Sequence, residues 1–167
     1  MSQTSDPIVC RADGFPLWSH DYAAAWIGLL ATQRRLTREL DAELEAAHGL
    51  TLSGLELLVR LASASERRLR LSVLAAEAGL SLSRVSRIVD MLESRKLVVR
   101  QPCPDDARAI NAELTPAGLE LAQAAQSTHL AAVRERFFDH LSEAEVATLA
   151  TVFLRFAPDA ASACARG

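Results

Sequence analysis

Residues 71–118 read LSVLAAEAGLSLSRVSRIVDMLESRKLVVRQPCPDDARAINAELTPAG, and this stretch decides the fold. Two short helical patterns meet at Gly79, and two strand patterns follow, separated by a charged loop that contains prolines. Thr115 followed by Pro116 is a strong helix start, because a capping residue precedes proline at the first helical position. The order predicts a helix-turn-helix followed by a two-stranded β-ribbon, or wing.

Within the helix-turn-helix, serines mark the helix starts. Ser72 is expected to cap a short helix over about residues 72–78, which Gly79 closes. Ser81 or Ser83 starts the second helix, which is predicted to run to about Lys96. The strand patterns cover residues 97–100 and 110–114. These helices and strands form the predicted winged unit.

Outward from this unit, apolar residues recur at helical spacing over about residues 21–48, and Gly49 is the expected left-handed stop. A leucine-rich helix over about residues 52–64 should be buried; Thr51 or Ser53 caps it, and Ser53 and Glu56 have capping-box spacing. Residues 65–70 are predicted to be a charged connector. Residues 1–17 show no periodicity and are expected to be an irregular arm.

On the C-terminal side, a helix is predicted from Pro116 to about His140. Ser142 and Glu145, at capping-box spacing, start a last helix that ends before Pro158. The fold class is therefore mostly α with a small β-wing: a winged helix-turn-helix flanked by N- and C-terminal dimerisation helices. The predicted division is an arm (1–17), a dimerisation helix (18–50), the winged helix-turn-helix (51–115), further dimerisation helices (116–157) and a tail (158–167).

The outer helices carry apolar stripes that nothing obvious in the chain covers. Burial against a second copy is the economical solution, and a two-fold dimer is the commonest form. We therefore predict a homodimer held by residues 18–48 and 119–157.

The charge distribution points to a polyanionic partner. The net charge is −3, yet residues 60–110 contain ten basic and six acidic residues, a local +4 inside flanks that carry −7. A basic middle is the electrostatic footprint expected of a DNA-binding unit. A helix-turn-helix places its second helix in the major groove, and an arginine-bearing wing reaches a minor groove.

These residues resemble the MarR family of bacterial transcription regulators over about residues 20–157. LTLSGLELLVRLA (50–62) is similar to the family's second helix, and SLSRVSRIVDMLESRKLV (81–98) to its recognition helix. DDARAINAELTPAG (105–118) matches an Asp-x-Arg wing tip and a Leu-Thr-x-x-Gly pattern. The resemblance implies a dimer that binds a palindromic operator, usually represses nearby genes and is released by a small molecule or an oxidant. Lys96 departs from the family, which usually has glycine at this position. A left-handed backbone conformation there suits glycine, and it would cost about 1 kcal/mol with lysine.

Several residues are expected to contact double-stranded DNA. Arg108 at the wing tip suits a narrow minor groove, and Asp106 would hold it through a carboxylate–guanidinium bond. The other candidates each have an alternative to DNA contact: a solvated charge for the basic residues and helix capping for the serines. These are Ser72, Ser81, Ser83, Arg84, Ser86, Arg87, Arg95, Lys96 and Arg100.

The effector is expected to be a small molecule, aromatic or phenolic, bound between the dimer helices and the winged unit. Trp26, Leu30, Gln33 and Arg34 are the candidate lining residues, although ordinary packing of Trp26 is an alternative. A thiol-based redox sensor that uses Cys103 or Cys10 is the alternative signal.

Other classes of function are disfavoured. The four histidines are scattered without metal-ligand spacing, and no phosphate loop, nucleophile elbow or carboxylate pair indicates an enzyme. We expect neither a metal nor a cofactor. No run of 18 apolar residues is present, no signal peptide is visible, and three distant cysteines favour a reduced, cytoplasmic protein. A winged helix used only for protein contact is a further alternative, which salt-dependent DNA binding would exclude.

Overall fold

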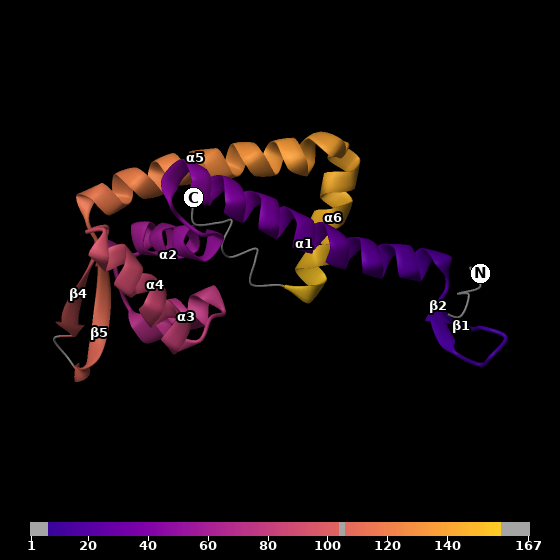
Figure 1. The fold of residues 1–167 in the computed structure, drawn as a ribbon, viewed down its shortest axis with the longest axis horizontal. Coiled ribbons are helices and arrows are strands. Elements are labelled where there is room, and N and C mark those ends of the chain that lie inside the picture. Colours follow the sequence, from indigo (N-terminus) through magenta and orange to yellow (C-terminus); the bar gives the residue numbers. More distant parts are fainter. Residues whose placement is uncertain (1–6, 104–105, 158–167) are drawn as a thin grey trace.

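The computed structural model describes residues 7–103 and 106–157, with the backbone alone for residues 106–108. Figure 1 shows an elongated arrangement with the winged unit at one end. From this unit α1 (His20–His48) and α5 (Pro116–Arg136) extend along each other, and α6 (Glu143–Phe156) follows a turn at the far end of α5. The predicted fold class is confirmed.

The winged unit contains three helices and one small sheet. The helices are α2 (Leu52–Ser63), α3 (Leu71–Ala78) and α4 (Leu82–Ser94). The strands β3 (Arg68–Arg70), β4 (Val98–Cys103) and β5 (Asp106–Leu114) form an antiparallel sheet in the order β3-β5-β4. Pro102 lies on β4, an edge strand, where its missing N–H costs no ladder bond. The helix-turn-helix and wing thus form as the sequence predicts.

The hydrophobic core lies within the winged unit and the adjoining half of α5. The leucine-rich α2 is its centre, as predicted, and residues from α4, the wing and α5 close around it. Burial of each large apolar side chain contributes about 1.5–3 kcal/mol. The largest fully buried side chains are Leu44, Leu50, Leu57, Leu58, Leu61, Leu74, Val85, Val89, Leu92 and Val98.

Local capping signals are mostly confirmed. Gly49 is left-handed, with φ 63°, and ends α1 at His48. Thr51 caps α2, because its side chain accepts a hydrogen bond from the Gly54 amide at 3.1 Å. The capping box predicted for Ser53 and Glu56 is therefore wrong, since both residues lie inside the helix that Thr51 starts.

The irregular arm predicted for residues 1–17 is wrong where the structure describes it. Strands β1 (Ile8–Cys10) and β2 (Pro16–Trp18) form an antiparallel hairpin. Gly14, with φ 82°, and Asp13, whose side chain accepts the Phe15 amide, build the turn. Strands of three residues are too short for a two-residue alternation to be visible in sequence. Residues 1–6, like the tail at 158–167, lie outside the described part of the chain.

The charged connector predicted for residues 65–70 is also wrong in part. It contains a 3-10 turn, η1 (Ser65–Arg67), and the edge strand β3, whose partner β5 lies more than 40 residues away in sequence. Ser72 does not cap α3: the helix begins one residue earlier, and Arg70 occupies the cap position without a side-chain bond.

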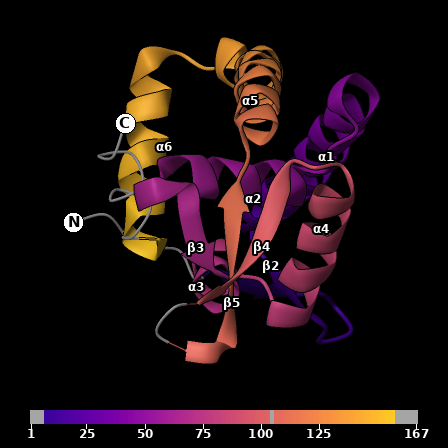
Figure 2. The same ribbon diagram turned by 90° about the vertical axis from the view of Figure 1, so that its left-hand side faces the viewer.

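The C-terminal helices differ slightly from the predicted bounds. Thr115 caps α5 and Pro116 opens it, as expected, but α5 ends at Arg136 and a 3-10 turn, η2 (Phe138–His140), follows. The capping box of Ser142 and Glu145 is confirmed. None of the 14 residues of α6 is buried. Figure 2 shows α6 on the opposite side of the molecule from α1, so the two helices cross in Figure 1 only by projection.

Candidate nucleic-acid interface

Helix α4 has the amphipathic pattern required of a recognition helix. Ser81 caps it and accepts the Arg84 amide at 3.3 Å. Val85, Val89 and Leu92 recur at helical spacing and are buried against the core. This burial leaves the opposite face of the helix for solvent or DNA.

The sequence candidates on α4 mostly lie on that outer face. Ser83, Arg84 and Arg87 are exposed, and Ser86 is half-buried. The Ser81 and Ser83 hydroxyls lie 3.2 Å apart at the N-terminus of the helix. Ser72 is exposed in the first turn of α3. Ser81, Ser83 and Arg84 thus lie together at the start of α4, whereas Ser72 lies at the start of a different helix.

The end of α4 explains the unusual lysine. Lys96 has φ 61°, so it adopts the left-handed conformation that the family resemblance implied for this position. The Lys96 amide bonds to the Glu93 carbonyl and the Leu97 amide to the Leu92 carbonyl, at 2.8 and 3.0 Å. These are the two bonds of a Schellman motif, which favours glycine at the left-handed position. The turn is therefore kept although lysine occupies its left-handed position.

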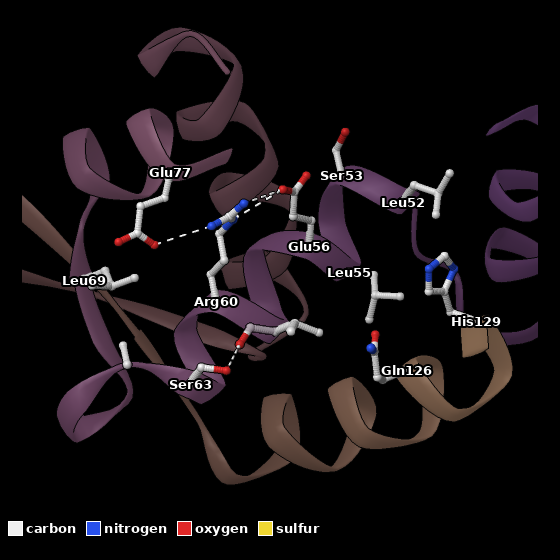
Figure 3. Close-up of a pocket in the computed structure, with 12 residues that line it drawn as sticks. Leu52, Ser53, Leu55, Glu56, Arg60, Ser63, Leu69, Glu77, Gln126 and His129 are labelled. Atoms are coloured by element: carbon white, nitrogen blue, oxygen red, sulfur yellow. Dashed lines mark hydrogen bonds and ion pairs between the residues drawn. The ribbon is translucent and has the colours of Figure 1, made fainter. Parts of the chain in front are cut away.

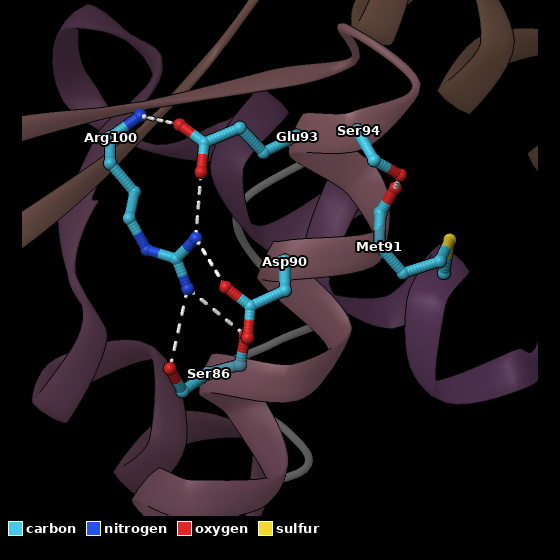
Figure 4. A network of polar contacts seen from close by, with 6 residues as sticks. All are labelled: Ser86, Asp90, Met91, Glu93, Ser94 and Arg100. Carbon is cyan, nitrogen blue, oxygen red and sulfur yellow. Dashed lines mark hydrogen bonds and ion pairs between the residues drawn. The ribbon is translucent and has the colours of Figure 1, made fainter.

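Arg100 joins the wing to α4 (Figure 4). Its guanidinium lies 2.7 Å from carboxylate oxygens of both Asp90 and Glu93 and donates to the Ser86 carbonyl at 3.0 Å. The Arg100 backbone amide also donates to Glu93 at 2.9 Å. This backbone hydrogen bond, followed by the guanidinium bond, lowers the pKa of Glu93.

This set of partners changes the interpretation of Arg100. Its side chain is 22% exposed, and the nearby acidic residues compensate its charge. The sequence predicted that Arg100 would contact the DNA backbone, and that contact stays a prediction. The geometry instead assigns Arg100 to holding the wing at a fixed angle to α4.

Two further cations also contact the protein itself. Arg95 donates to the carbonyls of Gly49 and His48, which ties α4 to the end of α1. Arg84 donates to the Ser53 hydroxyl of α2 at 3.2 Å. Within residues 7–103 and 109–157, no hydrogen bond or ion pair involves the side chains of Arg87 or Lys96. Among the cations predicted to contact DNA from α4 and the turn after it, these two are therefore the ones left available.

The wing tip is described through its backbone. Asp106 and Arg108 lie on β5 by their backbone, at the end of the strand next to the wing loop, but their side chains lie outside what the structure describes. Their predicted pairing and minor-groove contact stay predictions.

The Leu-Thr-x-x-Gly pattern has a packing reason at the base of the wing. The Thr115 hydroxyl accepts the Gly118 amide at 2.9 Å and contacts the carbonyls of Lys96 and Leu97. A Cβ at position 118 would lie 2.0 Å from the Leu97 carbonyl oxygen. Only glycine lets α5 approach the strand this closely.

A groove of about 770 Å³ lies beside α2, between α3 and α5 (Figure 3). Arg60 crosses it, with ion pairs to Glu56 at 2.8 Å and Glu77 at 3.6 Å. His129 lines the groove; burial lowers its pKa, and its Nδ1 atom has no hydrogen-bond partner. The other lining residues are Leu52, Ser53, Leu55, Val59, Ser63, Ala64, Leu69 and Gln126.

The predicted effector residues lie elsewhere. Trp26, Leu30, Gln33 and Arg34 are exposed on the N-terminal half of α1, and none of them lines this groove or the smaller one beside it. The groove was missed because its walls come from segments far apart in sequence.

Two of the three cysteines lie within the described ranges. Cys103 is buried, which shields its thiol, and Cys10 is exposed on β1; both are free thiols. Residues 7–103 and 106–157 hold no cluster of side chains suited to a metal ion. Across the same ranges, no helix is both long and apolar enough to cross a membrane.

Sequence reasoning also missed Asp90, Glu93 and Ser53. Ser86, Asp90 and Glu93 recur at spacings of four and three residues, so they form one stripe on α4, and this stripe was a usable signal for a basic partner. No comparable signal pointed to the contact between Ser53 and Arg84, which are 31 residues apart.

The comparisons with known proteins agree with this geometry. The MarR family model matches residues 48–109, whereas no curated protein matches the sequence. AbsC, a MarR family transcriptional regulator from Streptomyces coelicolor, is 32% identical, with a TM-score of 0.78 over 87% of this chain and 98% of its own. Sco3205, a MarR family transcriptional regulator from the same organism solved in complex with DNA, is 31% identical, with a TM-score of 0.78 over 87% of this chain and 91% of its own.

A probable transcriptional regulator from Pseudomonas aeruginosa has the same fold at 24% identity and a TM-score of 0.70, over 81% of this chain and 98% of its own. Members of the family that the first two relatives share are transcription regulators, not enzymes. The identity to AbsC over nearly its full length, together with the winged helix-turn-helix, decides the assignment: this chain belongs to the MarR family and is a DNA-binding transcription regulator.

Proposed function

We propose that the protein is a cytoplasmic, homodimeric repressor that binds a palindromic operator and is released by a small-molecule effector. The observation that carries the proposal is the exposed polar face of α4, with Arg87 uncommitted, beside a wing whose angle Arg100 holds. A relative of similar fold was solved with DNA, which supports the same use of this face.

Base reading is assigned to Arg87 and Arg84, because arginine can bond a guanine edge through two parallel hydrogen bonds. Lys96 and the helix starts at Ser72, Ser81 and Ser83 are assigned to phosphates, which position the protein without specifying sequence. Arg108 is assigned to the minor groove.

The homodimer is supported by large apolar side chains on the outer helices that stay exposed within one chain. On α6, Phe153, Leu154 and Phe156 are exposed, Phe156 by 82%. Trp26 and Ile27 are more than half exposed on α1. A helix of 14 residues is marginal in water by itself, so α6 needs a packing partner. A second copy supplies one, and a two-fold axis would pair the two recognition helices with half-sites about one DNA turn apart.

The effector site is assigned to the groove beside α2. Its walls belong to α2, α3 and α5, so an occupant can favour one arrangement of the winged unit against α5. Release needs only a higher affinity of the effector for the arrangement that does not bind DNA.

A titration against DNA from immediately upstream of the protein's own gene, at two salt concentrations, tests the proposal. We expect binding that resists competitor DNA and weakens as salt rises, together with dimers in sedimentation at micromolar concentration. Arg108→Ala is expected to lower affinity at least tenfold in a folded protein. Equal, weak affinity for random DNA, or a monomer, would contradict the proposal.

A further inference from the structure

Ser53 has no structural duty in starting α2. Thr51 is the cap and binds the Gly54 amide, so the hydroxyl of Ser53, the second residue of the helix, is available for other contacts. It accepts a hydrogen bond from Arg84 Nη2 at 3.2 Å. This contact joins α2 to the first turn of the recognition helix.

Arg84 keeps most of its donors while bound to Ser53. A guanidinium has five N–H groups in a rigid fork, and this contact uses one of them. Arg84 and Arg87 are three residues apart on α4 and both are exposed, so they share the outer face. An arginine loses rotamer freedom when it binds a base edge, and an internal hydrogen bond that already restricts its rotamers reduces that loss.

Ser53 also lies at the edge of the groove assigned to the effector, next to Glu56 (Figure 3). A group that bonds to the Ser53 hydroxyl from the groove therefore shares this hydroxyl with Arg84 and can displace it. Arg84 itself does not line the groove, so Ser53 is the residue that belongs to the groove and also contacts Arg84.

We propose that Ser53 is a positioning residue for Arg84: it holds the guanidinium ready for base reading and connects the occupancy of the groove to that reading. The proposal rests on the proposed function, since it requires sequence-specific DNA binding through α4. It adds a specificity-determining residue outside the helix-turn-helix surface.

A double-mutant cycle tests the positioning role. The preferred operator is first selected from randomised DNA, and the affinities for it and its single-base variants are measured for wild type, Ser53→Ala, Arg84→Ala and the double variant. Ser53→Ala is expected to lower operator affinity about three- to tenfold. It should weaken discrimination at the same base pairs as Arg84→Ala, and it should add nothing to Arg84→Ala. Ser53→Thr keeps the hydroxyl and should restore most of the affinity and discrimination.

The outcomes separate this inference from the proposed function. If Ser53→Ala has no effect, acts additively with Arg84→Ala, or weakens all sequences equally, the positioning role is wrong while the regulator assignment stands. If the wild-type protein selects no sequence, both are overturned.

Alkylation tests the link to the groove. In a background with Cys10→Ser and Cys164→Ser, which leaves the buried Cys103, Ser53→Cys is treated with iodoacetamide. Ser65→Cys is the matched control, because Ser65 is exposed on the same unit but lines neither groove. Modification at position 53 is expected to lower operator affinity at least threefold further, and modification at position 65 to leave it unchanged. An unchanged affinity at 53, or an equal loss at both positions, would overturn the link.

Discussion

Helices α2 and α6 are similar in length and both mostly apolar in sequence, but they have opposite environments. In α2, five of 12 residues are buried, whereas α6 buries none of its 14. The N-terminal half of α1 resembles α6, because it has no buried residue. The buried residues of α1 are Leu40 and Leu44, and both lie in its second half. Apolar content in a sequence therefore does not say whether the same chain covers it.

The contrast separates two sources of stability. The winged unit buries its leucines within one chain, so its stability should not depend on protein concentration. In the proposed dimer, the exposed apolar surfaces of the outer helices are stabilised by association, which depends on concentration by mass action. The predictions below test this division, from the largest expected effect to the smallest.

Gly118→Ala should damage the self-contained core most. The new Cβ would meet the Leu97 carbonyl oxygen at 2.0 Å and Leu114 Cδ1 at 2.8 Å, so strand and helix must separate. We expect a loss of about 3 kcal/mol or more in the free energy of unfolding, measured by urea denaturation. Gly28→Ala is the control: its Cβ meets nothing within 4 Å, and alanine favours helix by up to about 1 kcal/mol. A loss at Gly28 would mean that a second chain covers this part of α1.

Leu154→Asp on α6 should break association and leave the core intact. Each buried leucine contributes about 1.5–3 kcal/mol and a two-fold interface contains it twice, so the dimer dissociation constant should rise about 100-fold or more. Sedimentation velocity measures this. Val73→Asp, equally exposed but on α3, should leave the dimer unchanged. An unaltered dimer in Leu154→Asp would remove α6 from the interface.

Arg100→Gln tests whether this residue braces the wing or contacts phosphate. If it is a brace, operator affinity falls roughly tenfold while the salt dependence of binding stays the same. A phosphate contact would instead reduce the slope of log affinity against log salt by about one. Anisotropy titrations at four salt concentrations distinguish the two, and a reduced slope would restore the original sequence-based interpretation.

Glu93 makes the contact of Arg100 with α4 dependent on pH. Because its pKa in the folded protein is lowered from 4.5, its contribution to stability is present above pH 4.5 and is lost as pH falls through the folded-state value. Glu93→Gln should flatten the decline of unfolding free energy below pH 4.5, measured by denaturation between pH 3 and 6. An identical pH profile in the variant would show that protonation of Glu93 does not change the stability of the protein.

Lys96→Gly should have the smallest effect. Relief of the left-handed strain gains about 1–2 kcal/mol, and the extra chain entropy of glycine in the unfolded state offsets about 0.5–1 kcal/mol of it. We expect a gain in Tm of a few degrees or less. Lys96→Ala removes the charge but keeps the strained Cβ, so it should show no gain; equal gains in both variants would assign the effect to charge.

The fold was largely predictable, because its signals are local. The caps at Ser81, Thr115 and Ser142 act within three or four residues, and the helix stops at Gly49 and Gly79 act through single dihedral angles. The hairpin and β3 were missed because three-residue strands carry almost no periodic signal. Their pairing depends on partners elsewhere in the chain.

The candidate site was predictable only as a set of residues. Sequence assigned Arg84 to the major groove and Arg95 and Arg100 to the DNA backbone, but it did not indicate which contacts each makes within the protein. The structure divides them by their partners, which lie 31, 46 and 14 residues away at Ser53, Gly49 and Ser86. Such contacts depend on how helices and strands pack, and they produce no pattern of fixed spacing in the sequence.

The sequence by itself determined the order of helices and strands, the winged helix-turn-helix and the family resemblance, because capping, hydrophobic periodicity and turn chemistry act over a few residues. The tertiary structure alone decided which cations are held by the protein, why position 118 must be glycine and where the groove lies. These properties depend on distances between segments remote in sequence, and only packing of the whole chain sets those distances.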